Sequence, residues 1–361
     1  MIFDPADPLG LSFQKAIENK LADFLAARRA GVVGLDAALA PLADQLIPLA
    51  LGGKHIRPGF VWWGYVAAAG EPPQPGGLLQ LAAALDLVHA GLLAHDDLID
   101  AADTRRGRPS LHRAVAGLAP APDDVLGTAG AVVGGALLLQ WGQEAADESG
   151  LLSPAARNVF NQLRRQVLAG QLADAWAAAG LPLFGPGGTA PLSQAAAVAE
   201  IDELKTASYT VTGPVQLGAV AGGASEPQLA GLANFGHPLG RAFQARDDVL
   251  DVFGDEITTG KPAGDDLRQG KATALVQSAL EMAGPAGAAE LRAVLGNRAA
   301  TADELAKARQ IIVDCGALAT VEKAITSDLA EALAALDKTD LQSEGKAGLI
   351  SLAEACIHRD R

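Results

Sequence analysis

Two short acidic motifs in this 361-residue chain could bind a metal ion. HDDLID covers residues 95–100 and RDDVLD covers residues 246–251, with aspartates at the same relative positions. Positions i and i+4 of a helix share one face, so the first and last aspartate of each motif should converge. Carboxylates packed this closely either take up protons or bind cations. Because the motifs provide oxygen ligands and no His/Cys metal spacing, Mg²⁺ is the expected ion.

Long helices are expected to position both motifs, because each motif ends a long apolar segment. Alternating strand patterns are rare, whereas apolar residues recur at helical spacing over roughly 11–29, 36–50, 58–70, 77–101, 123–147, 153–179, 193–224, 226–252 and 272–283. Capping signals accompany these segments, for example Ser153-Pro154 and Thr301 with Glu304. We therefore expect an all-α fold and a single domain over residues 1–361. If the two motif helices face each other, six carboxylates would surround one cavity.

The overall composition limits the class of protein. With 49% hydrophobic and 19% charged residues the chain should fold into a globular protein. A net charge of −14 argues against a nucleic-acid binder. Cys315 and Cys356 form neither a disulfide framework nor a zinc site, and no leader pattern is evident, so a cytoplasmic protein is expected. The uncharged stretch 125–143 is long enough to approach a membrane span. Its glycines and glutamines and the lack of a basic flank favour a buried core helix.

Basic residues lie close to both acidic motifs in the sequence. GGKHIRP (52–58) carries Lys54 and Arg57, and TRRGRP (104–109) follows the first motif. GKPAGDDLRQGK (260–271) follows the second motif, and ELKTAS (203–208) lies in an apolar segment. Each basic pair alone would normally be a solvated surface feature. Their repeated association with acid clusters and with turn-forming Gly and Pro favours a phosphate site.

The motifs GGKHIRP, LVHAGLLAHDDLIDAADTRRGRP, GQLAD, ELKTASYT, FQARDDVLD and GKPAGDDLRQGKAT occur in this order over residues 52–273. Together they resemble the trans-isoprenyl diphosphate synthases, the polyprenyl synthetase family. The resemblance implies an isoprenoid synthase fold: an all-α bundle of long helices around a deep central cavity, usually a homodimer. It implies head-to-tail condensation of isopentenyl diphosphate with an allylic diphosphate. It also implies three Mg²⁺ ions, with Mn²⁺ as an alternative, and a motif-bearing core over about residues 50–275.

The resemblance also implies roles for individual residues. The expected metal ligands, most of them also catalytic, are Asp96, Asp97, Asp100, Asp247, Asp248 and Asp251. Isopentenyl diphosphate is expected to contact Lys54, Arg57, His89 and Arg106. The allylic diphosphate is expected to contact Arg105, Lys205, Thr206, Gln244, Lys261 and Lys271, with Lys205 also catalytic. Gln171 and Asp174 are expected to hydrogen-bond to the ligand-binding residues and to orient them.

The residues before Asp96 are predicted to influence product length. Leu92, Gly91 and Val88 precede it by four, five and eight positions. In this family a bulky aromatic near the fifth position blocks chain growth, and Gly91 has no side chain. We therefore expect a C20 product, geranylgeranyl diphosphate, with C15 and C25 or longer as alternatives. The other interpretation is that Gly91 permits close helix packing.

Two further functional interpretations remain open. A class I terpene cyclase would replace parts of the second motif with Asn, Ser or Thr and Glu, and a non-catalytic partner subunit would lose a motif. The chain departs from the family pattern at two positions. His55 stands where many members have Arg, and Gly135, which follows Gly134, stands where many members have an aspartate. The departure at Gly135 is expected to weaken a structural polar contact.

Overall fold

A computed structural model describes residues 3–254 and 264–358. The chain forms two compact units, which are described separately below. Unit 1 comprises Met1–Phe160, Pro214–Leu229 and Asp340–Leu352, and unit 2 comprises Asn161–Gly213, Ala230–Thr339 and Ala353–Arg361. The prediction of a single domain therefore stays a prediction.

Unit 1 holds the first aspartate motif. In chain order its elements are α1 (Leu11–Leu35), η1 (Ala37–Leu39), α2 (Ala40–Ala50), α3 (Ile56–Ala69), α4 (Pro75–Ile99), β1 (Thr104–Arg105), β2 (Arg108–Pro109), α5 (Leu111–Ala116) and α6 (Asp124–Glu148). Parts of α7 (Pro154–Ala178), α9 (Gly213–Ala221), α10 (Glu226–Phe253) and α17 (Ser343–Ile357) also belong to it.

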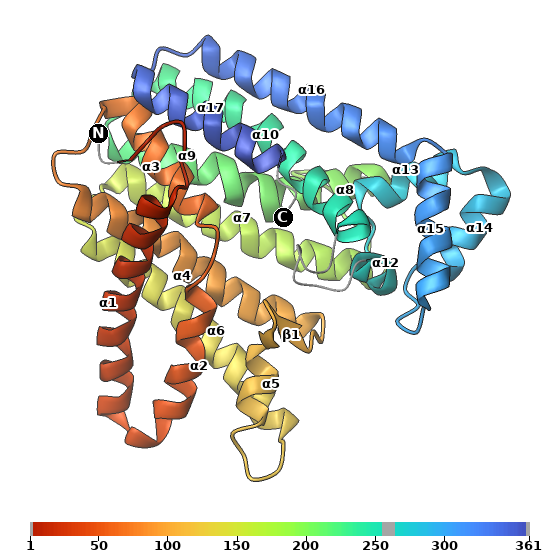
Figure 1. Ribbon diagram of the computed structural model, residues 1–361, viewed down its shortest axis with the longest axis horizontal. Helices are drawn as coiled ribbons and strands as arrows, with labels where there is room; N and C mark the ends of the chain where they lie inside the picture. Colours follow the sequence, from red (N-terminus) through yellow and green to blue (C-terminus); the bar gives the residue numbers. More distant parts are fainter. Residues whose placement is uncertain (1–2, 255–263, 359–361) are drawn as a thin grey trace. The chain divides into compact units, whose positions relative to one another are not determined.

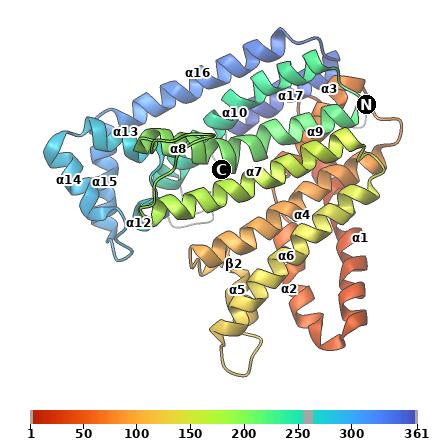
Figure 2. The same ribbon diagram turned by 180° about the vertical axis from the view of Figure 1, so that it is seen from behind.

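The helices α4 and α6 run side by side through unit 1 (Figures 1 and 2). Glycines allow this close approach, because a Cβ at Gly142 would lie 2.6 Å from Val88 Cγ2. A Cβ at Gly91 would likewise lie 2.7 Å from the carbonyl oxygen of Gly135. The packing interpretation of Gly91 is therefore confirmed: its Cα faces the α6 backbone and not an open space.

The departure at Gly135 has a steric explanation within the same pair of helices. A Cβ at this position would overlap the Nε2 atom of His95 on α4. That nitrogen lies 3.2 Å from the carbonyl oxygen of Val132 on α6. The imidazole thus fills the space that a larger side chain at Gly135 would need, and it makes a polar contact with α6. The expected loss of a polar contact is therefore offset by His95.

The apolar core of unit 1 includes a cluster of aromatic side chains. Trp62 and Trp63 on α3 are almost fully buried, and Phe3 and Phe13 contact Trp62 in edge-on geometry. Fully burying a large apolar side chain contributes about 1.5–3 kcal/mol. The cluster anchors α1 and α3, and α3 begins directly after the GGKH segment. The core therefore fixes the position of that segment.

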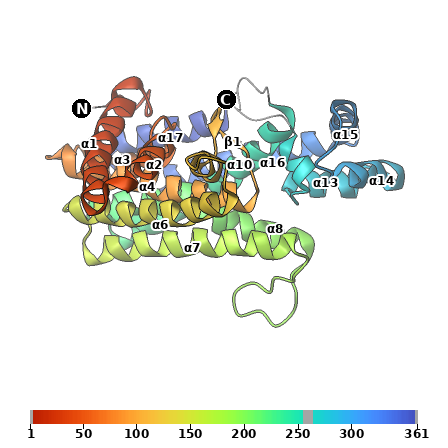
Figure 3. The same ribbon diagram turned by 90° about the horizontal axis from the view of Figure 1, so that it is seen from below.

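Unit 2 holds the second aspartate motif at the end of α10. Its other elements are α8 (Gln194–Asp202), the π-helix η2 (Glu203–Thr212), α12 (Asp265–Gln269), α13 (Ala274–Met282), α14 (Gly284–Val294), α15 (Ala302–Asp314) and α16 (Ala317–Asp337). Within unit 2, α15 packs against α14 and α16, and α13 packs against α16 (Figure 3).

Glycines on α10 let η2 pack against it within unit 2. A Cβ at Gly236 would lie 2.6 Å from Thr212 Oγ1, and one at Gly240 would overlap Ala207. Arg246 on α10 donates two hydrogen bonds of 2.7 Å to the carboxylate of Glu322 on α16. This pair of parallel hydrogen bonds holds α10 against α16 at the start of the second motif.

The all-α prediction is confirmed, with local exceptions. Among the described residues the segment expected as one helix over 193–224 divides into α8, η2 and α9. The Thr301–Glu304 capping box is confirmed, since each side chain bonds to the other's backbone. The Ser153 cap is also confirmed, because its hydroxyl accepts a 3.2 Å hydrogen bond from Ala156 N.

Two of the described helices, α4 and α6, are long and apolar enough to cross a membrane. The apolar window of α4 is 61% buried and that of α6 is 44% buried. The prediction of a buried core helix over 125–143 therefore holds for one face of α6 only. On the other face Val125, Val132 and Val133 are 81%, 50% and 54% exposed. Core helices also meet these criteria, so length and apolarity are weak evidence of a membrane span.

Candidate active site

The first aspartate motif lies at the C-terminal end of α4. Asp97 is fully buried, and its Oδ1 atom accepts a 2.9 Å hydrogen bond from Arg105 Nε and another from Nη2 of the same guanidinium. The second oxygen, Oδ2, is buried without a hydrogen-bond partner in the described part of the chain. Arg105 Nη2 also lies 3.9 Å from Asp96 Oδ2. One arginine therefore holds the buried member of the motif in place, next to the partly exposed Asp96 and Asp100.

A two-residue hairpin positions the arginines that follow this motif. Strands β1 and β2 pair Arg105 with Arg108, and the connecting residues Arg106 and Gly107 have φ angles of 52° and 71°. Positive φ at both central positions matches the twist of paired strands. Glycine adopts this conformation readily, whereas Arg106 is strained there. The hairpin thereby presents Arg105 and Arg106 in a fixed arrangement.

Three of the residues predicted to bind isopentenyl diphosphate, Arg57, His89 and Arg106, come together in unit 1. Burial, followed by the positive charges of Arg57, Arg106 and Arg105, lowers the pKa of His89 well below its usual value. The imidazole is thus neutral at pH 7 among three guanidinium groups. Arg106 Nη1 donates a 3.2 Å hydrogen bond to the carbonyl oxygen of Leu51, just before the GGKH segment. This concentration of positive charge suits a polyanion.

His55 takes a structural role within the same segment. It is 2% exposed, has φ 54°, and its Nδ1 lies 2.6 Å from Asp86 Oδ2 on α4. Burial alone would lower the pKa of His55, but the hydrogen bond with Asp86 and the charges of Asp86 and Glu18 outweigh it and raise the pKa. The residue that replaces the family's Arg therefore points to Asp86.

Replacing His55 with Asn is expected to give pH-dependent destabilisation. Asn tolerates a left-handed backbone but cannot carry the charge. Because the folded-state pKa of His55 is raised, its stabilisation is complete below the unfolded pKa and is lost as pH rises through the folded pKa. At pH 5.5 the variant should be less stable by about 1.5–3 kcal/mol, the range for charged hydrogen bonds. Urea unfolding between pH 5.5 and 8.5 measures this.

The exposed His358 provides the matched control for this experiment. The difference between wild type and His55→Asn should narrow toward high pH, whereas His358→Gln should match the wild type throughout. A difference that is constant across the pH range would contradict the role given to the charged imidazole.

The second aspartate motif ends α10 in unit 2. Asp248 is 3% exposed, and its Oδ1 atom accepts a 2.6 Å hydrogen bond from Gln244 Nε2. Burial and the charge of Asp202 raise the pKa of Asp248 well above its usual value, and its Oδ2 has no hydrogen-bond partner among the described residues. Asp251 Oδ1 accepts a 2.9 Å hydrogen bond from the backbone of Asp266. As in the first motif, the second aspartate is the buried one.

The π-helix η2 carries Lys205, whose Nζ donates a 2.6 Å hydrogen bond to Asp174 Oδ2 on α7. This confirms contact between two residues that the GQLAD and ELKTAS motifs singled out. Burial and the charge of Asp174 raise the pKa of Asp202 to about 7 despite Lys205. The sequence interpretation missed Asp202, although it precedes Lys205 by three residues. Helical segments of π type occur often at functional sites.

The other predicted residues have mixed outcomes. Lys261 lies outside the described residues. Lys271 Nζ lies 3.5 Å from Asp266 Oδ1, which brings it near the loop that contacts Asp251. Thr206 and Gln171 are half-buried on η2 and α7. Their contacts with a ligand stay predictions.

The donor atoms near the motifs suit a hard cation. Across residues 3–254 and 264–358, no three His, Cys, Asp and Glu side chains are grouped so as to hold a metal ion by themselves. Mg²⁺ commonly uses one or two carboxylates and completes its shell with waters and substrate phosphates, so a preformed group is not required. The buried Oδ2 atoms of Asp97 and Asp248 are unsatisfied acceptors that a cation or its waters could satisfy.

Comparisons with known proteins agree with this arrangement. The polyprenyl synthetase family matches residues 40–312. The farnesyl diphosphate synthase of Geobacillus stearothermophilus is 33% identical over 72% of this chain and 80% of its own length. The geranylgeranyl diphosphate synthase of Mycobacterium tuberculosis is 31% identical over 81% of this chain and 77% of its own.

A solved structure is also similar. The geranylgeranyl pyrophosphate synthase of Corynebacterium glutamicum, complexed with isoprenyl diphosphate and magnesium, has a TM-score of 0.87 and 34% identity, covering 96% of this chain and 98% of that one. With the all-α fold and two aspartate motifs, the family match leads to one conclusion. The chain belongs to the polyprenyl synthetase family and is a trans-prenyltransferase.

Proposed function

We propose that the protein condenses isopentenyl diphosphate head-to-tail with an allylic diphosphate and releases an all-trans polyprenyl diphosphate. The observation that carries this proposal is that Arg57, Arg105 and Arg106 surround the neutral His89 of α4, and that Arg105 also bonds to Asp97 near the end of the same helix. A diphosphate needs several fixed cations, and this protein has a net charge of −14, so the concentration of arginines in one place is informative.

In unit 1, different residues would bind isopentenyl diphosphate and the allylic diphosphate. Lys54, Arg57 and Arg106 would hold isopentenyl diphosphate by charge-assisted hydrogen bonds, and the uncharged His89 could donate one more. Arg105 would contact the allylic diphosphate while its guanidinium keeps Asp97 oriented. The apolar side chains of α4 would keep water away from the reacting carbons.

In unit 2, we propose that Lys205, Thr206, Gln244, Lys261 and Lys271 bind the allylic diphosphate or stabilise the allylic cation. The hydrogen bonds of Lys205 to Asp174 and of Gln244 to Asp248 fix two of these side chains in advance. Such preorganised groups stabilise charge that develops on the leaving diphosphate. Gln171 and Asp174 would support them.

Three Mg²⁺ ions, or Mn²⁺ in their place, would be held by the two motifs, through Asp96, Asp97, Asp100, Asp247, Asp248 and Asp251. The oxygen-only donors of both motifs and the unsatisfied Oδ2 atoms of Asp97 and Asp248 support this assignment. When bound, the ions would act as Lewis acids that stabilise charge on the departing diphosphate.

A C20 product is our proposal for chain length, with C15 and C25 or longer as the rivals. Leu92 lies one turn before Asp96 on the same face of α4 and is half-buried, whereas Gly91 and Val88 pack against α6. We therefore assign the main control of length to Leu92. Extension assays with C5, C10 and C15 allylic diphosphates and chromatography of the products test the proposal, and a dominant C15 product from the wild type would contradict it.

Enlarging Leu92 to Phe is expected to shorten the main product by one C5 unit, because the ring would occupy space beneath Asp96. Gly91→Phe should instead destabilise the protein by more than about 1–3 kcal/mol, the usual cost of overpacking, since its side chain would meet the α6 backbone. Product chromatography and urea unfolding of both variants measure these effects. An unchanged product from Leu92→Phe, or a stable Gly91→Phe variant, would contradict the assignment.

We also propose a cytoplasmic homodimer, with α6 in the contact. The exposed Val125, Val132 and Val133 give this helix an apolar face, and obligate interfaces resemble such faces. Val132→Glu should shift the protein toward monomer in size-exclusion chromatography with light scattering. The control is Ala121→Glu in the preceding loop, which is also exposed. A wild type that elutes as a monomer would contradict the proposal.

A further inference from the structure

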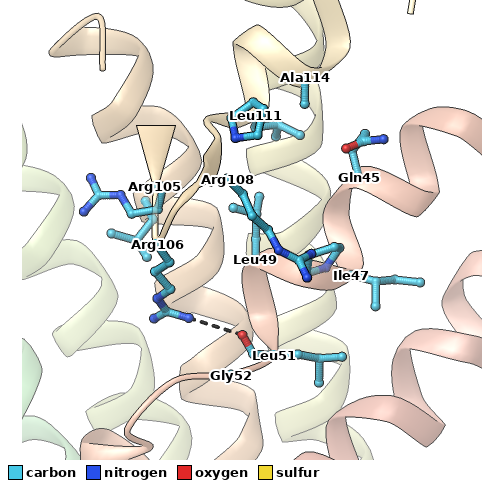
Figure 4. Close-up of a pocket in the computed structure, with 13 residues that line it drawn as sticks. Gln45, Ile47, Leu49, Leu51, Gly52, Arg105, Arg106, Arg108, Leu111 and Ala114 are labelled. Carbon is cyan, nitrogen blue, oxygen red and sulfur yellow. Dashed lines mark hydrogen bonds between the residues drawn. The ribbon is translucent and has the colours of Figure 1, made fainter. Parts of the chain in front are cut away.

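Unit 1 contains a pocket of about 460 Å³ on the side of the hairpin that faces α2 (Figure 4). Its volume falls in the range of about 300–1,000 Å³ that small-molecule sites occupy. None of the six motif aspartates lines it, and neither do Lys54, Arg57 or His89. The pocket is thus separate from most of the residues assigned above to the substrates.

The walls of the pocket are mostly aliphatic. Ile47, Leu49 and Leu51 come from α2 and the residue that follows it, and Leu111 comes from the start of α5. Several of these side chains are only half-buried, so part of the apolar surface faces the open pocket. A hydrocarbon chain would cover this surface and gain about 25 cal/mol per Å² removed from water.

Three arginines line the pocket, and one of them, Arg108, lies among these apolar side chains. Figure 4 shows the guanidinium of Arg108 next to α2, whereas the guanidinium of Arg105 points away and that of Arg106 is bonded to Leu51. Arg108 has no hydrogen bond or ion pair with any residue in the described ranges. Gln45 is the other polar side chain of the lining apart from the arginines.

Arg108 is exposed and has no ion pair within the described part of the chain, although the chain as a whole is acidic. The chain has 42 acidic residues against 28 basic ones. Arg113, five residues later, lies 2.9 Å from Asp103 and 3.4 Å from Asp124. These two acidic side chains are paired with Arg113, so the exposed guanidinium of Arg108 can pair with an external anion.

We infer that this pocket binds an amphipathic anion, a hydrocarbon chain that ends in a phosphate or diphosphate. The anion would pair with Arg108 and accept a hydrogen bond from Gln45, while the chain lies along Ile47 and Leu49. Such a ligand exists either as a dissolved monomer or as a lipid within a membrane surface. A volume of about 460 Å³ suits a single small ligand, which favours the dissolved monomer. Binding here requires neither Mg²⁺ nor turnover, so it can be tested apart from the proposed activity.

Dodecyl phosphate, below its critical micelle concentration and with EDTA present, is a suitable probe for isothermal titration of the full chain. The wild type should show one saturable site. Arg108→Ala should weaken binding by about tenfold or more, as expected for a charge-assisted hydrogen bond. Leu49→Trp, which fills the pocket from a half-buried position, should weaken it to a similar extent.

Two controls locate the probe. Arg113→Ala removes a nearby arginine outside the pocket and should bind like the wild type. Lys54→Ala disturbs the proposed isopentenyl diphosphate site and should also retain binding. Thermal unfolding of each variant checks that it is folded. If Arg108→Ala and Leu49→Trp bind normally, or if only Lys54→Ala loses binding, the inference is wrong.

A second arm separates the two sources of the anion. Vesicles of phosphatidylcholine with phosphatidylglycerol are sedimented with wild type and with Arg108→Ala. We expect little co-sedimentation for either protein. Arg108-dependent vesicle binding without binding of monomeric dodecyl phosphate would overturn the inference in favour of a lipid surface.

Discussion

Asp96→Asn is expected to lower kcat/KM for isopentenyl diphosphate incorporation by about a thousandfold without unfolding the protein. Asp96 is partly exposed, so its loss should cost little stability. The substitution removes one anionic oxygen ligand from the first motif, and losing one group that stabilises transition-state charge typically costs about 10²–10³ in rate. Incorporation of radiolabelled isopentenyl diphosphate, with far-UV circular dichroism, measures both quantities.

The control for this variant is Asp103→Asn. Asp103 follows the motif closely, but its side chain is 78% exposed and pairs with Arg113. Its replacement should change kcat/KM less than about twofold, since exposed ion pairs contribute little. Equal losses in the two variants would show that the general acidity of this region matters and not the motif itself.

Arg105→Met is expected to destabilise the protein by about 3–5 kcal/mol, because it leaves the fully buried carboxylate of Asp97 without its counter-ion. Replacing both partners with apolar residues of similar size is often close to neutral. The double variant Arg105→Met/Asp97→Leu should therefore recover most of the lost stability. Urea unfolding of the three proteins gives the coupling free energy directly.

Arg113→Met serves as the reference for a solvent-exposed arginine, and it should cost less than about 1 kcal/mol. A double Arg105/Asp97 variant as unstable as Arg105→Met would mean that packing, and not the unpaired charge, determines the loss. Activity should be low in both Arg105 variants, since this residue is also proposed to contact the allylic diphosphate.

Helical segments and site motifs were predictable from sequence for a physical reason. Periodic apolar residues define a helix face locally, and the two aspartate motifs are contiguous in sequence. Capping residues such as Thr301 act within a single turn, so their interactions could be read without tertiary information. The ends of α4 and α10 were therefore placed close to their observed bounds.

Features that depend on packing between helices could not be predicted. Gly91 could widen the product cavity only if its face of α4 pointed away from α6, whereas in the structure this face packs against α6. The spacing between Gly91 and Asp96 does not tell which face of α4 contacts α6. The partner of His55 is Asp86, 31 residues away, and the pair forms only when α3 and α4 are assembled. The π-helix η2 likewise replaced a regular helix where Lys205 meets Asp174.

The central claim is tested most directly by incubating the purified protein with Mg²⁺, radiolabelled isopentenyl diphosphate and geranyl diphosphate. The account predicts that label enters longer all-trans diphosphates, up to C20, and that EDTA abolishes the reaction. It also predicts that geranylgeranyl diphosphate alone gives no cyclised hydrocarbon. Failure of the wild-type protein to consume isopentenyl diphosphate with any allylic primer would contradict the account.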